Sequence, residues 1–252
     1  MAGKMAWCSA VLPLVRVFLC EVFAMMAGAH ASKKVFGHKR LGSVLRLWLQ
    51  MMKYSQAIPP APTMKVNHDW VVRSDAMGEG KIARIGGWFG QIGNVWESEN
   101  TLNVCWFQED VPDCFFPTHK ETANLYISAN ETLAIAISAH LWGKQLAGSD
   151  GKTIYAHQTD SMVGVHVTRK FSAKSKNMLL ATKAVALVAA HHKLHVRVSH
   201  FPGKLNVLAD GISRQNLEIM RFLNPEKRTR VCITNFLKWV TSNPTPSWCE
   251  KG

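Results

Sequence analysis

The chain has 252 residues, of which 47% are hydrophobic, and this content supports a substantial core and excludes wholesale disorder. Lys and Arg number 30 against 17 Asp and Glu, so the formal net charge is +13, which attracts phosphate backbones or an anionic membrane. The six cysteines are widely spaced and include no CxxC pair, which argues against a structural zinc site and a disulfide scaffold and favours a reducing compartment.

Residues 1–60 are predicted to form a helical appendage, because apolar residues recur at three-to-four spacing in two stretches. Residues 1–32 also resemble a signal peptide, but three residues interrupt the apolar run: Pro13, Arg16 and Glu21. We therefore expect amphipathic helices, no stable membrane insertion and an intracellular location, in the cytoplasm or nucleus. Secretion by a signal peptide is the alternative.

A basic stretch and a proline-rich stretch follow within this part of the chain. The basic residues of 33–40 could lie along a nucleic acid or be ordinary solvated side chains, and the sequence leaves both interpretations open. The sequence AIPPAP at 57–62 breaks any helix. We place a domain boundary there, with a linker over 61–68 and the main domain over 69–216.

The main domain is predicted to alternate strands and helices. Three strands are expected at 70–75, at 83–90, and at 94–97 together with 104–107, followed by an irregular insertion over 108–125. The later elements are a helix starting at Ser128, a strand at 153–159, helices at 161–171 and 177–190, a strand at 194–199 and a short helix holding Asp210. A basic tail, 217–252, is expected to hold one more helix ending near Trp239.

This order predicts an α/β fold with a mixed five-stranded sheet flanked by helices. The first three strands are close enough in sequence to form an antiparallel meander. The last two follow helical crossovers, so they should be parallel to the first.

Four acidic residues, Asp75, Glu131, Asp160 and Asp210, are candidates for one site. Asp75 and Asp160 are predicted to end parallel neighbouring strands, so both should leave the sheet at the same edge. Glu131 is placed in the first turn of the connecting helix, and Asp210 in the helix after the last strand. Four converging carboxylates repel one another unless divalent cations lie among them, and oxygen ligands favour Mg²⁺ or Mn²⁺. Two such ions are the usual device for attack at a phosphodiester.

Each acid also has a purely structural interpretation. Asp75 could begin a turn before Gly78, and Glu131 could complete a capping box with Ser128. Asp160 and Asp210 could be helix N-caps. The four interpretations together are harder to sustain, because all four acids occur in the order that one sheet edge requires.

Residues 71–214 resemble the ribonuclease H domain of retroelement reverse transcriptases, most closely that of the tyrosine-recombinase class of retrotransposon. The resemblance lies in the ordered motifs SDA at 74–76, GGW at 86–88, NETL at 130–133 and TDS at 159–161. The final stretch, from HFPG at 200–203 through Asn206 to ADGISR at 209–214, is the most specific. Residues 1–60 resemble the end of the preceding polymerase thumb, and we expect no polymerase activity.

The resemblance implies a ribonuclease H-like fold and two-metal hydrolysis of the RNA strand in an RNA–DNA hybrid, with no small-molecule cofactor. It assigns metal ligation to the four acids, and proton transfer or product release to His200, which could instead be a strand-end histidine contacting backbone. Contacts with the hybrid are expected from four further residues: Ser161, Lys204, Asn206 and Arg214. The alternative function is that of a catalytically inactive remnant that acts as a basic nucleic-acid-binding protein.

Overall fold

A computed structural model of the 252-residue chain provides the fold. It describes the following residues: 5, 13–20, 22–23, 38–56, 65–66, 69–93, 95–98, 101–116, 126–146, 153–173 and 175–242. The predicted signal-peptide end and most of the basic stretch 33–40 lie outside them. Among the described residues, none of the helices has the length and hydrophobicity needed to cross a bilayer.

The centre of the molecule is a mixed sheet with the strand order β6-β3-β2-β7-β8. The strands are β2 (Trp70–Glu79), β3 (Ile82–Gln91), β6 (Cys105–Asp110), β7 (Thr153–Thr159) and β8 (His195–His200). Strands β2, β3 and β6 are antiparallel neighbours, whereas β7 is parallel to β2 and β8 is parallel to β7. The predicted mixed five-stranded sheet flanked by helices is confirmed.

Two details of the strand prediction are wrong, and one short strand was not predicted. Of the predicted range 94–97, Trp96 and Glu97 do not belong to the third strand, because β4 (Trp96–Ser98) pairs with β5 (Thr101–Leu102) in a separate two-stranded sheet. Residues 108–110, predicted to be irregular, extend β6, because the ten-residue strand β3 offers them a partner as far as Arg84. The predicted linker 61–68 contains the short strand β1 (Lys65–Val66), which pairs in parallel with β7.

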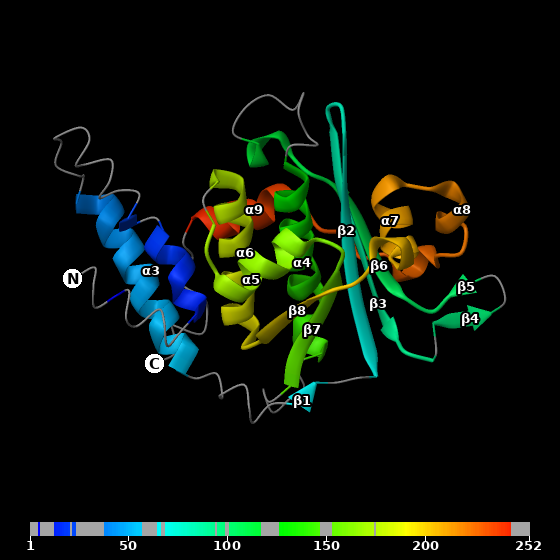
Figure 1. Cartoon of the computed structure of the whole chain (residues 1–252), viewed down its shortest axis with the longest axis horizontal. Helices are drawn as coiled ribbons and strands as arrows, with labels where there is room; N and C mark the ends of the chain where they lie inside the picture. The colour runs from blue at the N-terminus through cyan, green and yellow to red at the C-terminus, as the bar shows by residue number, and fades with distance from the viewer. Residues whose placement is uncertain are drawn as a thin grey trace.

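Helices cover both faces of the sheet (Figure 1). One face carries α4 (Ile127–Leu146), α5 (Met162–Lys170), α6 (Lys176–His192) and α9 (Ile233–Thr241); the other carries α7 (Val207–Arg214) and α8 (Leu217–Met220). Short 3-10 turns lie at η1 (Pro13–Val15), η3 (Asp113–Phe115), η5 (Gly203–Leu205) and η6 (Pro225–Lys227). Helices α4 and α6 are rich in Ala and Leu, together with Ile in α4 and Val in α6, on every side, which suits helices packed between the sheet and further helices.

Helices on both sides of the predicted domain 69–216 pack into the same core. Helix α3 (His38–Gln56) lies within the predicted appendage and contributes buried apolar residues to the cluster that contains α4 and α6. Helix α9, predicted in the basic tail, also buries its apolar face there, through Ile233, Phe236, Leu237 and Val240. The segment 217–242, predicted as part of a basic tail, therefore packs against the domain through α9.

Candidate functional site

Parallel pairing of β2 and β7 sets the level of two acids. The prediction that Asp75 ends its strand is wrong, because β2 continues to Glu79. Arg73 of β2 is nevertheless in register with Gln158 of β7. Asp75 lies two residues further along β2, and Asp160 lies two residues further along the chain, directly after the end of β7. Since both strands run in the same direction, the two aspartates lie at the same level of the sheet and on the same side of their strands.

A third carboxylate joins them from α4. The ligand oxygens of Asp75, Glu131 and Asp160 all lie within 4.8 Å of one another, and we call these three residues the acidic triad. Glu131 is the fifth residue of α4 and lies beyond its first turn. Since α4 begins at Ile127, Ser128 lies inside the helix and cannot be its N-cap, so the predicted capping box does not form.

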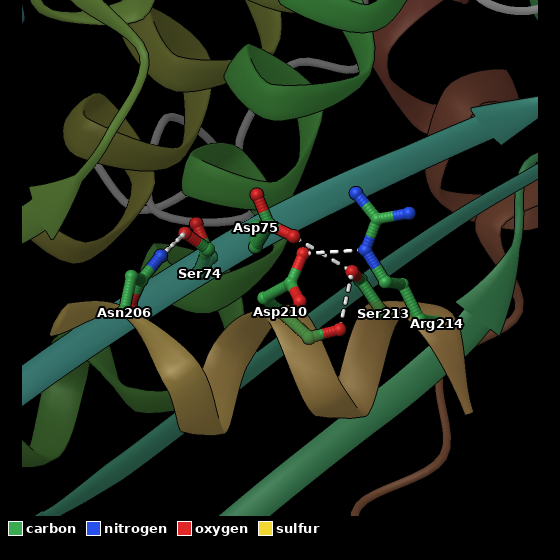
Figure 2. Close-up of polar contacts among 6 residues, drawn as sticks. All are labelled: Ser74, Asp75, Asn206, Asp210, Ser213 and Arg214. Atoms are coloured by element: carbon green, nitrogen blue, oxygen red, sulfur yellow. Dashed lines mark hydrogen bonds and ion pairs between the residues drawn. The ribbon is translucent and has the colours of Figure 1, made fainter. Parts of the chain in front are cut away.

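Helix α7 brings Asp210 close to Asp75 (Figure 2), but Asp210 is not part of the triad. In β3, Gly86 pairs with Asp75, and a Cβ at Gly86 would lie 2.8 Å from the backbone nitrogen of Ser213, so α7 packs directly on this glycine. The Ser213 hydroxyl is 2.7 Å from Asp75 Oδ2, to which it donates. Asp210 Oδ1 accepts a hydrogen bond from Arg214 Nε at 2.6 Å and forms an ion pair with it.

Burial and mutual repulsion disfavour the ionised forms of the triad carboxylates. Burial, together with the negative charges of Asp160 and Asp210, raises the pKa of Asp75 to about 7, although the Ser213 hydrogen bond works in the opposite direction. Burial also raises the pKa of Glu131, against a hydrogen bond from Ser161. Asp160 Oδ1 is buried and has no hydrogen-bond partner. Three converging carboxylates, one of them with an unsatisfied buried oxygen, form a donor set that fits a hard divalent cation such as Mg²⁺ or Mn²⁺.

The other predicted site residues fall into two groups. His200, at the end of β8, and Lys204 are exposed, and Arg214 is exposed apart from its ion pair. Ser161 is buried as the N-cap of α5, where its hydroxyl accepts from a backbone N–H. Asn206 is 1% exposed, and its side-chain amide is 3.4 Å from the Ser74 carbonyl oxygen. The role of each in nucleic-acid binding stays a prediction.

Two residues that support the triad were not among those predicted. Ser213 follows Asp210 by three residues, so one turn of α7 places its hydroxyl beside the same site. Gly203, in η5, leaves room for Asp160, because a Cβ there would lie 2.9 Å from Asp160 Oδ2. The Pro-Gly turn in the sequence was a visible signal for a tight loop, but it did not indicate which side chain the loop approaches.

Replacing Gly203 with Ala should weaken divalent-cation binding. The added methyl group must displace the Asp160 carboxylate, and displacement of groups that orient metal ligands costs about 10-fold to 100-fold in affinity. Titration calorimetry with Mg²⁺ or Mn²⁺ measures the effect. Gly42→Ala in α3 is the matched control, because a Cβ there meets only Arg46 at 3.9 Å. Equal metal affinity in the two variants would show that Gly203 does not position Asp160.

The comparisons with known proteins give only solved structures. The sequence matches no protein-family profile and no curated protein. RNase H1 from the halophilic archaeon Halobacterium salinarum NRC-1 is similar at 13% identity and a TM-score of 0.40, over 59% of this chain and 97% of that one. LC11-RNase H1, solved in complex with an RNA/DNA hybrid, has 14% identity and a TM-score of 0.41, over 59% and 96%. The N-terminal RNase H domain of rv2228c from Mycobacterium tuberculosis has 15% identity and a TM-score of 0.39, over 59% and 93%. With TM-scores this low, the fold class follows from this chain's own strand order and register.

Proposed function

We propose that this chain is a divalent-metal-dependent nuclease of the ribonuclease H type, which hydrolyses the RNA strand of RNA–DNA hybrids. The observation that carries the proposal is the acidic triad, three carboxylates whose ligand oxygens all lie within 4.8 Å of one another. The net charge of +13 suits a polyanionic substrate. The order of the sequence motifs around the four acids further supports an origin in a retrotransposon reverse transcriptase, as a part or a remnant of it.

The proposed function assigns metal binding to the acidic residues and proton transfer to His200. Asp75, Glu131 and Asp160 would hold the metal, with Asp210 adding a ligand if its carboxylate turns from Arg214. A bound pair of Mg²⁺ or Mn²⁺ ions would supply activation of the attacking water and stabilisation of the leaving oxygen. The exposed imidazole of His200, on the strand next to Thr159, would accept or release a proton at the rim of the site.

One observation favours the second candidate, an inactive nucleic-acid-binding remnant. The carboxylate of Asp210 is held by Arg214 and lies outside the triad, so the fourth ligand is withheld in this conformation. Such a protein would keep its basic surface and bind hybrid without cleaving it. The two candidates therefore differ in one measurable property, which is strand cleavage.

Cleavage of a hybrid labelled on either strand separates the candidates. We expect the RNA strand alone to be cut, only with Mg²⁺ or Mn²⁺, and neither double-stranded DNA nor double-stranded RNA to be cut. Asp160→Asn should lower the rate at least about 100-fold, because metal stabilisation of a developing charge contributes several kcal/mol. Glu79→Gln, which removes an exposed carboxylate at the end of β2, should leave the rate unchanged. Binding without cleavage would contradict the proposed nuclease and support the second candidate.

A further inference from the structure

Arg73 is held rigidly beside the acidic triad. Its Nε donates to Gln158 Oε1 at 2.9 Å, and its guanidinium carbon lies 3.6 Å from the centre of the Phe201 ring. The Trp88 ring centre is 5.5 Å from the same carbon on β3, the next strand. A hydrogen bond and two aromatic neighbours therefore fix the plane of this guanidinium before any ligand arrives.

The fixed guanidinium keeps most of its hydrogen-bonding capacity. Arginine has five N–H donors, and only the Nε–H of Arg73 is used by another described residue. Arg73 is only partly buried, and neither of its Nη groups forms a hydrogen bond with another described residue. Among the described residues, no carboxylate forms an ion pair with Arg73, although Asp210 is paired with Arg214. A planar cation with two free amino groups is suited to a phosphate.

Arg73 lies on the same strand as Asp75 of the acidic triad and close to it. Arg73 and Asp75 are two residues apart in β2, so their side chains lie on the same face, with α-carbons about 7 Å apart. Successive phosphates of one strand are farther apart than their axial rise of about 3.4 Å, because the backbone also winds around the axis, so this separation is on the scale of one to two nucleotides. A strand whose scissile phosphate lies at the triad can therefore present a neighbouring phosphate to Arg73.

The alternative is that Arg73 only stabilises the fold and does not bind phosphate. Arg73 joins β2 to β7 through Gln158 and to the loop after β8 through Phe201, and it could serve only to fix that loop. In that role the guanidinium acts on Gln158 and Phe201 within the protein, so its loss lowers stability without changing the number of phosphates that the protein neutralises. In phosphate binding the charge matters most, because each neutralised phosphate releases condensed counterions and adds to the salt dependence of binding.

We propose that Arg73 binds a phosphate of the nucleic acid through its two Nη groups, next to the acidic triad. The inference rests on the function proposed above, because it takes the polynucleotide as the ligand. It adds an anion-binding residue that comes from the first long strand of the sheet and is separate from the exposed basic residues Lys204 and Arg214. Arg73 would fix the register of the strand on the enzyme and would not take part in bond cleavage.

The test is the salt dependence of hybrid binding, measured by fluorescence anisotropy without added metal between about 50 and 200 mM salt. Arg73→Met should weaken binding about 10-fold, in keeping with loss of a charge-assisted hydrogen bond, and should lower the salt slope by about 1. Arg73→Lys should retain the slope, since a charge remains. Arg230→Met is the control, because Arg230 is exposed and lies beside α9 on the opposite face of the sheet.

Three results would overturn the inference: an unchanged slope and affinity in Arg73→Met, an equal loss in Arg230→Met, or a loss of slope in Arg73→Lys that matches Arg73→Met. The last result would assign Arg73 to the loop contact, and thermal unfolding of both variants would show the lost stability. Failure of the proposed function gives a different result, since the wild-type protein would then bind the hybrid with the Arg73-dependent slope but would not cleave it.

Discussion

Replacing Asp75 with Asn is expected to stabilise the metal-free protein by about 4 kcal/mol at about pH 8. Burial and the neighbouring acids raise the pKa of Asp75 from 3.8 to about 7. Between these two values the unfolded chain has lost the proton and the folded chain keeps it, so the folded state loses stability as the pH rises toward 7. Above about pH 7 the penalty is complete, and the neutral asparagine removes it.

Divalent cations should reverse this ranking. A cation at the triad stabilises the ionised form of Asp75, so Mg²⁺ should raise the stability of the wild-type protein more at about pH 8 than at about pH 6. It should do little for Asp75→Asn. Urea unfolding with and without Mg²⁺ at both pH values measures the four quantities, and Glu79→Gln on the same strand controls for the loss of one negative charge. A wild-type protein that is no less stable than Asp75→Asn at the higher pH would show that the buried carboxylate is not strained.

The sequence predicted the sheet because its signals are local. Apolar and polar residues alternate in the strand predicted at 194–199, which forms β8, and the GGW motif at 86–88 lies in β3, where α7 packs on Gly86. The order of strands and helices then left few ways to connect them, and the parallel pairing of β2 with β7 followed. Asp75 and Asp160 lie at one level for that reason, even though the predicted end of β2 was four residues early.

The details of the site were out of reach because they depend on distant contacts. Ser213 meets Asp75 across 138 residues of sequence, and this contact exists only because α7 rests on β3. The ion pair that draws Asp210 away from the triad is a local i,i+4 contact with Arg214, yet only the position of α7 decides whether it competes with a metal. Arg73 could not be predicted, because an arginine in a strand carries no functional signal until its neighbours Phe201 and Gln158 are known.

A buried histidine in the core provides the second large expected effect, a loss of stability in acid. His157 lies in β7 with no exposed surface, where Ser74 Oγ is 2.9 Å from Nε2 and Tyr155 Oη is 3.2 Å from Nδ1. Burial lowers the pKa of His157 from 6.5 to about 3. The unfolded chain therefore takes up a proton below about pH 6.5 that the folded chain refuses, and stability is lost as the pH falls toward 3.

His157→Gln should remove this acid sensitivity while keeping a polar side chain between the two hydroxyl groups. The wild-type protein should lose about 3 kcal/mol from this residue between about pH 7 and pH 4, and the variant should lack that part of the decline. Urea unfolding across this range measures the difference in slope, in which all other titrating groups cancel. The exposed His200→Gln is the matched control and should leave the slope unchanged. If His157→Gln declines in parallel with the wild-type protein, His157 must be protonated within the folded core, with Ser74 and Tyr155 both accepting hydrogen bonds from it.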